Sequence, residues 1–204
     1  MMRNIDDLEE LAKRGNIYAQ RSLGQSYLSG KVVEKDEVKA AHYFMMAAEQ
    51  GDGYSQYLLG LCYFRKTSKI HDYEKAAIWL EKALDNKLFV SHTLLYLGDC
   101  YYYGEAIKDL VKAFELYTKS ADSGNIEAME RIALCYKNGD GVKRDDNIAE
   151  EWYTKAEKKR KKYEFERKLQ ESRGGQEDWK RELSEMSNLS DAFDGYPDAV
   201  WNID

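Results

Sequence analysis

Four copies of one pattern, each about 36 residues long, run through most of this sequence. A Leu-Gly pair, or its variant Ile132-Ala133, marks each copy, and a Tyr follows three residues after the Gly or Ala. The other pairs are Leu23-Gly24, Leu59-Gly60 and Leu97-Gly98. A unit of this length cannot bury its apolar face alone, so consecutive units are expected to stack on one another and share a continuous core.

The second block of each copy indicates a helix. In the first copy, Ala40-Ala41, Phe44 and Ala47-Ala48 follow the spacing of three and four that places residues on one helical face. An Asp precedes each block and is a predicted N-cap, because its carboxylate can accept hydrogen bonds from the first-turn N–H groups. These residues are Asp36, Asp72, Asp109 and Asp145. Gly51 and Gly124 follow two of the blocks and predict helix ends in the left-handed conformation.

The Gly of each Leu-Gly pair falls inside a predicted helix, where it costs about 1 kcal/mol relative to Ala. Its recurrence at one register position predicts close contact between two helices of an antiparallel hairpin. Between the second and third copies the terminal Gly is replaced by Lys87, and residues 88–90 lengthen the turn. The apolar content of this turn predicts that it folds back onto the body.

These residues resemble the Sel1-like repeat, a subclass of the tetratricopeptide-like solenoids. The resemblance implies an all-α, right-handed α-solenoid of about four and a half helical hairpins, with residues 4–14 as the half repeat. The loops at 65–71 and 104–108 depart from the family pattern, the first by lacking Gly and the second by being shorter. The predicted organisation is a solenoid over 1–157, a charged capping helix and a short amphipathic helix over 158–187, and an acidic-aromatic tail over 188–204.

Composition excludes several classes of protein. The net charge is −6, which equals the charge of residues 182–204 alone, and this acidic balance disfavours nucleic acid as a partner. No apolar run approaches the roughly 20 residues of a membrane helix, and the N-terminal residues form no apolar signal segment. The three Cys are an odd number, so a cytoplasmic location is expected. The basic run at 158–162 is either a solvated helix face, the favoured interpretation, or a site for an acidic partner or nucleic acid.

No constellation of residues indicates catalysis. Cys62, Cys100 and Cys135 share one repeat position and are predicted to be small buried side chains, too far apart for disulfides. The three His have no metal-ligand spacing. We therefore expect no cofactor, no metal and no enzymatic activity.

The resemblance implies that the first helix of each hairpin lines the inner curve of the solenoid. The partner-binding residues predicted on these helices are Tyr18, Arg21, Tyr54, Tyr57, Leu61, Phe64, His92, Leu95, Asp99, Tyr102, Glu127 and Glu130. Aromatic side chains there would supply binding energy and charged ones would set orientation. In the alternative interpretation, some of them pack against the next repeat or against the tail.

The expected function is that of an adaptor or scaffold that holds a partner protein or peptide in this groove. Two narrower alternatives are an immunity protein that neutralises a cognate bacterial toxin and a secreted effector that acts on host proteins. An enzyme is the least favoured class. The sequence leaves the identity of the partner and the oligomeric state open.

Overall fold

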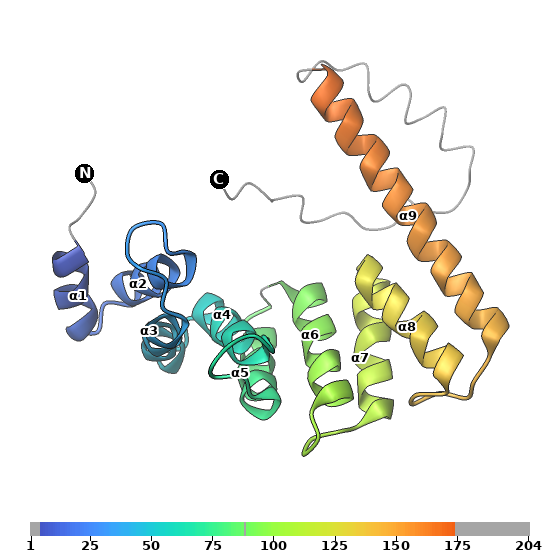
Figure 1. The fold of residues 1–204 in the computed structure, drawn as a ribbon, viewed down its shortest axis with the longest axis horizontal. Helices are drawn as coiled ribbons and strands as arrows, with labels where there is room; N and C mark the ends of the chain where they lie inside the picture. Colours follow the sequence, from blue (N-terminus) through green and yellow to red (C-terminus); the bar gives the residue numbers. More distant parts are fainter. Residues whose placement is uncertain (1–4, 88, 174–204) are drawn as a thin grey trace. The chain divides into compact units, whose positions relative to one another are not determined.

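The computed structural model describes residues 5–87 and 89–173, and this part of the chain contains nine α-helices and no strand (Figure 1). It divides into two units, residues 1–153 and 154–204, which are described separately. The helices are α1 (Ile5–Lys13), α2 (Ile17–Ser29), α3 (Glu37–Glu49), α4 (Gly53–Phe64), α5 (Tyr73–Asp85), α6 (Val90–Tyr103), α7 (Leu110–Asp122), α8 (Ile126–Asn138) and α9 (Asp146–Arg173).

The first unit is a stack of helical hairpins, as the repeat predicts. Each helix from α1 to α7 packs against the next one in the chain, and α4 also contacts α6. The pairs α2/α3, α4/α5 and α6/α7 are the first three hairpins, and α8 with the start of α9 is the fourth. We call α2, α4, α6 and α8 the first helices. The predicted half repeat is α1, and the long helix expected over 145–172 is α9.

The same hydrogen-bond geometry recurs at four Asp residues, each of which joins a loop to the following helix. The carboxylates of Asp72 and Asp109 accept hydrogen bonds from backbone N–H groups at 3.0 and 2.9 Å, which confirms them as N-caps. Their own N–H groups donate to the carbonyls of Tyr63 and Tyr101, at 2.8 and 2.9 Å. One residue type therefore ends the loop and begins the helix. Asp36 and Asp145 make the corresponding bonds.

The glycines inside the first helices allow close packing within each hairpin. A Cβ atom at Gly98 would lie 2.6 Å from a ring carbon of Tyr117, which is well inside ordinary contact distance. A Cβ atom at Gly24 would likewise lie 2.5 Å from a ring carbon of Phe44, and one at Gly60 would lie 2.7 Å from the Cγ atom of Leu80. The predicted close contact is confirmed, and its cause is a large side chain of the second helix seated on the glycine.

Buried amides link the first two hairpins in a chain of hydrogen bonds that we call the amide bridge. Gln20 donates to a main-chain carbonyl of α1 at 2.9 Å and accepts from Gln50 at 2.7 Å. Gln56 donates to a carbonyl of α3 at 3.1 Å and accepts from Asn86 at 2.9 Å. In α6 the equivalent position is the buried Leu94, so the amide bridge ends at α5.

The longer turn between α5 and α6 folds back, as predicted. Phe89 adopts a left-handed conformation with φ 46°, and its ring centroid lies 5.0 Å from that of Tyr57 and 5.9 Å from that of Tyr54.

The predicted amphipathic helix at 176–187 and the tail at 188–204 lie outside the described residues. No helix in the described ranges is both long and apolar enough to cross a membrane.

Candidate binding site on the first helices

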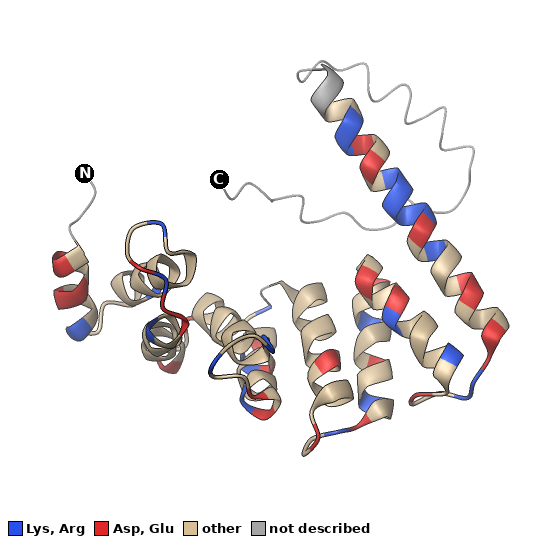
Figure 2. Ribbon diagram, viewed as in Figure 1, with Lys and Arg blue, Asp and Glu red and all other residues tan. Residues whose placement is uncertain are grey.

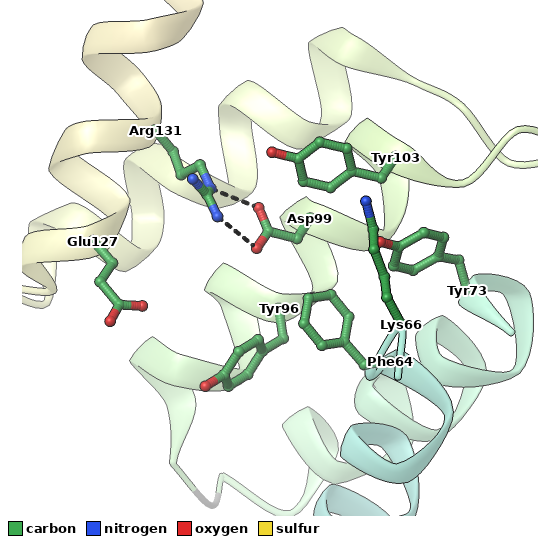
Figure 3. A pocket seen from close by; sticks show the side chains of 8 residues that line it. All are labelled: Phe64, Lys66, Tyr73, Tyr96, Asp99, Tyr103, Glu127 and Arg131. Carbon is green, nitrogen blue, oxygen red and sulfur yellow. Dashed lines mark hydrogen bonds and ion pairs between the residues drawn. The ribbon is translucent and has the colours of Figure 1, made fainter. Parts of the chain in front are cut away.

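A pocket of about 330 Å³ opens between α4, α5, α6 and α8, and we call it the α4–α8 pocket (Figure 3). Three of these four elements are first helices. Figure 2 shows that α4 carries no charged side chain and that α6 carries one, which is Asp99. The lining residues are Phe64, Lys66, Tyr73, Tyr96, Asp99, Tyr103, Glu127 and Arg131.

Aromatic rings from three helices form one side of the pocket. The ring of Phe64 lies 5.1 Å from that of Tyr96 and 5.7 Å from that of Tyr73, centroid to centroid. Tyr73 stacks at 6.3 Å on Tyr103, whose side chain is exposed. These separations suit favourable tilted and offset ring contacts. Burial raises the pKa of the Tyr96 hydroxyl above its ordinary value.

An ion pair between the buried Asp99 and the partly exposed Arg131 joins the third and fourth repeats at the pocket. Asp99 is 3% exposed and accepts from the Tyr117 hydroxyl at 2.8 Å. It also accepts from Nε and Nη2 of Arg131, at 2.8 and 3.2 Å. Burial acts against the charge of Arg131, but the hydrogen bonds to Asp99 and its attraction outweigh that cost and raise the arginine pKa. Three hydrogen bonds, one from Tyr117 and two from the counter-ion Arg131, satisfy the carboxylate, which is the arrangement that a buried charge requires.

Two further charges lie on the sides of the pocket. The Nζ atom of Lys66 stands 4.9 Å from the centroid of the Tyr103 ring. Glu127 is exposed in the first turn of α8. In Figure 3 the two side chains lie on opposite sides of Tyr96 and Phe64. The pocket thus has an apolar middle with an ammonium group at one side and a carboxylate at the other.

A second cluster lies on α2 and α4. The guanidinium of Arg21 is 5.1 Å from the Tyr18 ring centroid and 5.7 Å from that of Tyr54. Arg21 also pairs with Asp52 at 3.3 Å, and the Tyr54 hydroxyl accepts from Gln25 at 3.3 Å. Tyr18 is 72% exposed, so a large part of this cluster faces solvent.

Six of the predicted residues thus fall into two groups: Phe64, Asp99 and Glu127 line the pocket, while Tyr18, Arg21 and Tyr54 form the cluster. Leu61, His92 and Glu130 are half-buried outside the pocket lining. The Tyr102 hydroxyl donates to Asp140 at 2.6 Å, so this residue holds the loop after α8. Burial and this hydrogen bond raise the Tyr102 pKa to about 12.

Three of the predicted contact residues have buried side chains in this structure. Leu95 is 1% exposed and belongs to the core. Tyr57 is 8% exposed because the Phe89 ring packs on it. Asp99 is occupied by Arg131 and Tyr117, so in this structure it organises the site and offers no free carboxylate to a partner.

The sequence interpretation did not select five of the lining residues. Tyr96 and Arg131 share one register position, two residues before Gly98 and Ala133, where the first two repeats have Ser22 and Leu58. This change of residue type at one position was a usable signal. Lys66 lies in the irregular loop at 65–71, Tyr73 begins α5 just after it, and Tyr103 ends α6. Among the described residues, no three His, Cys, Asp or Glu are placed to hold a metal ion.

Comparison with known families decides the classification. The Sel1 repeat model matches residues 17–52, 53–88, 91–125 and 126–159. The chain belongs to the Sel1 repeat family. These matches coincide with the four hairpins, and Sel1 repeat proteins generally mediate protein–protein interactions and are typically non-catalytic scaffolds.

Among curated relatives, the chain is 28% identical over 99 residues to the ERAD-associated E3 ubiquitin-protein ligase component HRD3B of Arabidopsis thaliana. That match covers 48% of this chain and 16% of the relative. It is 26% identical over 138 residues to a putative sel1-like repeat-containing protein, L21, of Acanthamoeba polyphaga mimivirus, covering 68% of this chain and 25% of the relative. The chain therefore spans a quarter or less of the length of these relatives.

Two solved structures resemble the fold closely. One is a protective antigen of uropathogenic Escherichia coli with an SLR fold, at a TM-score of 0.62 and 34% identity, covering 76% of this chain and 33% of the antigen. The other is a Sel1 repeat protein from Oxalobacter formigenes, at a TM-score of 0.61 and 26% identity, covering 76% of this chain and 63% of that protein. Both support the all-helical solenoid.

Proposed function

We propose that this chain is a non-catalytic adaptor that holds a segment of a partner protein along its first helices. The observation that carries the proposal is the row of partly exposed aromatic side chains from α2 to α6, which ends in the α4–α8 pocket. Aromatic groups of this kind dominate binding hot spots, because they bury a large area at a small cost in side-chain entropy.

The relatives support a role in an assembly. HRD3B is named as a component of an E3 ubiquitin-protein ligase, so this relative is part of an assembly with other proteins. We extend only the general role of holding a protein to this chain. Nothing in the described residues favours a toxin or a host protein over another partner, and the cytoplasmic location stays a prediction that cell fractionation checks.

The test is affinity capture from the source cells followed by mass spectrometry, with three forms of the full chain. Wild type is compared with the double variant Tyr54→Ala/Phe64→Ala, which truncates one ring of the α2–α4 cluster and one ring of the pocket. The matched control is Ile78→Ala/Val111→Ala, which removes two exposed apolar side chains of α5 and α7. Circular dichroism shows that each form is folded.

We expect a partner that wild type and the control retain and that the Tyr54→Ala/Phe64→Ala variant loses. The partner is then confirmed with the two purified proteins by titration calorimetry. A partner retained equally by all three forms would place binding elsewhere and would refute the assignment to the first helices. Turnover of a substrate by the purified chain would refute the non-catalytic role.

A further inference from the structure

Resting on the proposed function, we propose that the α4–α8 pocket takes one aromatic side chain of the partner, with an acidic residue beside it in the partner sequence. The proposal defines the chemistry of the partner. It follows from the size of the pocket, from its ring-lined side and from the charges that are left uncompensated around it.

The size of the pocket matches one large side chain. A dry cavity of about 150 Å³ is enough to hold a benzene molecule. The α4–α8 pocket, at about 330 Å³, therefore has room for an aromatic ring and the adjoining main chain. Phe64 and Tyr96 are half-buried and their centroids lie 5.1 Å apart, so they present ring surface to an occupant. Aromatic pairs gain energy beyond area burial, which favours a ring over an aliphatic side chain.

The charges around the pocket favour an anion next to that ring. Arg131 directs Nε and Nη2 to Asp99, which leaves Nη1 with no acceptor among the described residues. The Arg131 side chain is 36% exposed, so a partner can reach it. Lys66 makes no ion pair within residues 5–87 and 89–173 and contacts the Tyr103 ring instead. Lys66 can therefore receive a carboxylate on its side of the pocket, while Nη1 of Arg131 is available only as a further hydrogen-bond donor.

The same charges disfavour a cation. A ring-lined pocket is an attractive site for Lys or Arg in general, because ring faces attract cations. Here Lys66 already lies over the face of Tyr103, and Arg131 has already taken up the buried carboxylate of Asp99. Only Glu127, on the opposite side, would attract a positive charge. The acidic neighbour of the aromatic residue is thus expected on the side toward Lys66, away from Glu127.

The test is selection from a phage-displayed random-peptide library on the immobilised full chain. The same selection is made on Lys66→Glu, which reverses the charge at the pocket, and on Phe64→Ala, which shortens its aromatic side. The matched control is Lys69→Glu, because Lys69 is an exposed residue of the same loop and does not line the pocket. Circular dichroism verifies the fold of each variant.

We expect wild type and Lys69→Glu to enrich peptides with an aromatic residue next to Asp or Glu. Lys66→Glu should keep the aromatic residue and exchange the acidic neighbour for Lys or Arg, and Phe64→Ala should lose the aromatic preference. By fluorescence anisotropy, the best wild-type peptide should bind Lys66→Glu about fivefold more weakly, whereas Lys69→Glu should be unchanged.

An unchanged acidic preference in Lys66→Glu, or no enrichment on wild type, would overturn the proposal. Selected peptides that no longer bind the Tyr54→Ala variant but still bind the Phe64→Ala variant would also overturn the pocket proposal. That result would leave the adaptor function intact. The two proposals therefore fail separately.

Discussion

Substitution of Gly98 by Ala should destabilise the protein although Ala is the better helix former. The change by itself would gain about 1 kcal/mol from helix propensity. The added Cβ, however, would lie 2.6 and 2.8 Å from two ring carbons of Tyr117, where carbon contacts normally lie at about 3.5–4.0 Å. The ring would have to move by about 1 Å for an ordinary contact to form.

Tyr117 has little freedom to make that movement. Its side chain is fully buried, and its hydroxyl is fixed at 2.8 Å from Asp99. Overpacking of a tight core costs about 1–3 kcal/mol, and weakening a hydrogen bond to a charged group costs about 1.5–3 kcal/mol when the bond is lost completely. Subtracting the helical gain leaves a net loss of about 2 kcal/mol in the free energy of unfolding.

The assay is urea denaturation followed by far-ultraviolet circular dichroism, with a thermal scan in parallel. A loss of about 2 kcal/mol corresponds to a midpoint lowered by about 4–8 °C in a chain of this size. The control is Glu115→Ala, an exposed position of α7, which should change stability by less than about 0.5 kcal/mol. If Gly98→Ala is as stable as wild type, helix propensity outweighs the ring contact and the close-packing explanation of the glycine is wrong.

Three other predictions follow from the structure. Asp99→Asn should lower the free energy of unfolding, measured in urea, by about 2 kcal/mol. The loss is smaller than for a fully buried pair because the Arg131 side chain is 36% exposed. Unchanged stability would show that the ion pair makes no net contribution to stability. Burial raises the pKa of Cys62 to about 11, and Tyr102 is raised to about 12, so the unfolded chain releases protons that the folded chain keeps. Stability should thus be constant up to about pH 8, fall as the pH passes the unfolded pKa of Cys62 near 9, and fall more steeply past that of Tyr102 near 10, by up to about 1.4 kcal/mol per pH unit and group. Urea titrations between pH 7 and 11 measure this dependence, and a flat profile would contradict the burial of these groups. Asp109→Ala should cost about 1 kcal/mol by removing the N-cap bond of α7, and a thermal midpoint equal to that of wild type would show that the cap is dispensable.

The repeat pattern made most of the fold predictable. Helix spacing, the capping aspartates and the mid-helix glycines are local signals, and each has a direct physical reason in a hairpin. The same register placed Phe64 and Glu127 at the pocket. It also predicted that Leu95 contacts a partner. In the structure this apolar side chain packs into the core instead.

The remaining features depend on contacts between repeats, which a register alone does not encode. Tyr57 is covered by Phe89, a residue that belongs to no repeat position. Arg131 reaches the pocket because Asp99, 32 residues earlier, draws its guanidinium toward α6. Pairings of this kind join residues from different repeats or loops, so the register of a single repeat does not show which partner each residue contacts.

The end of the amide bridge at α5 has a consequence for how the stack comes apart. Solenoid stability is a sum of unit terms and nearest-neighbour terms, so unfolding begins where a neighbour term is smallest. Hydrogen-bonded amides couple α1 through α5, and the Asp99–Arg131–Tyr117 group couples α6 through α8, while the apolar Leu94 stands at the junction. We therefore expect the solenoid to unfold as two cooperative blocks that meet between α5 and α6. Because the pocket draws side chains from both blocks, a bound partner would clamp the junction and merge two unfolding transitions into one.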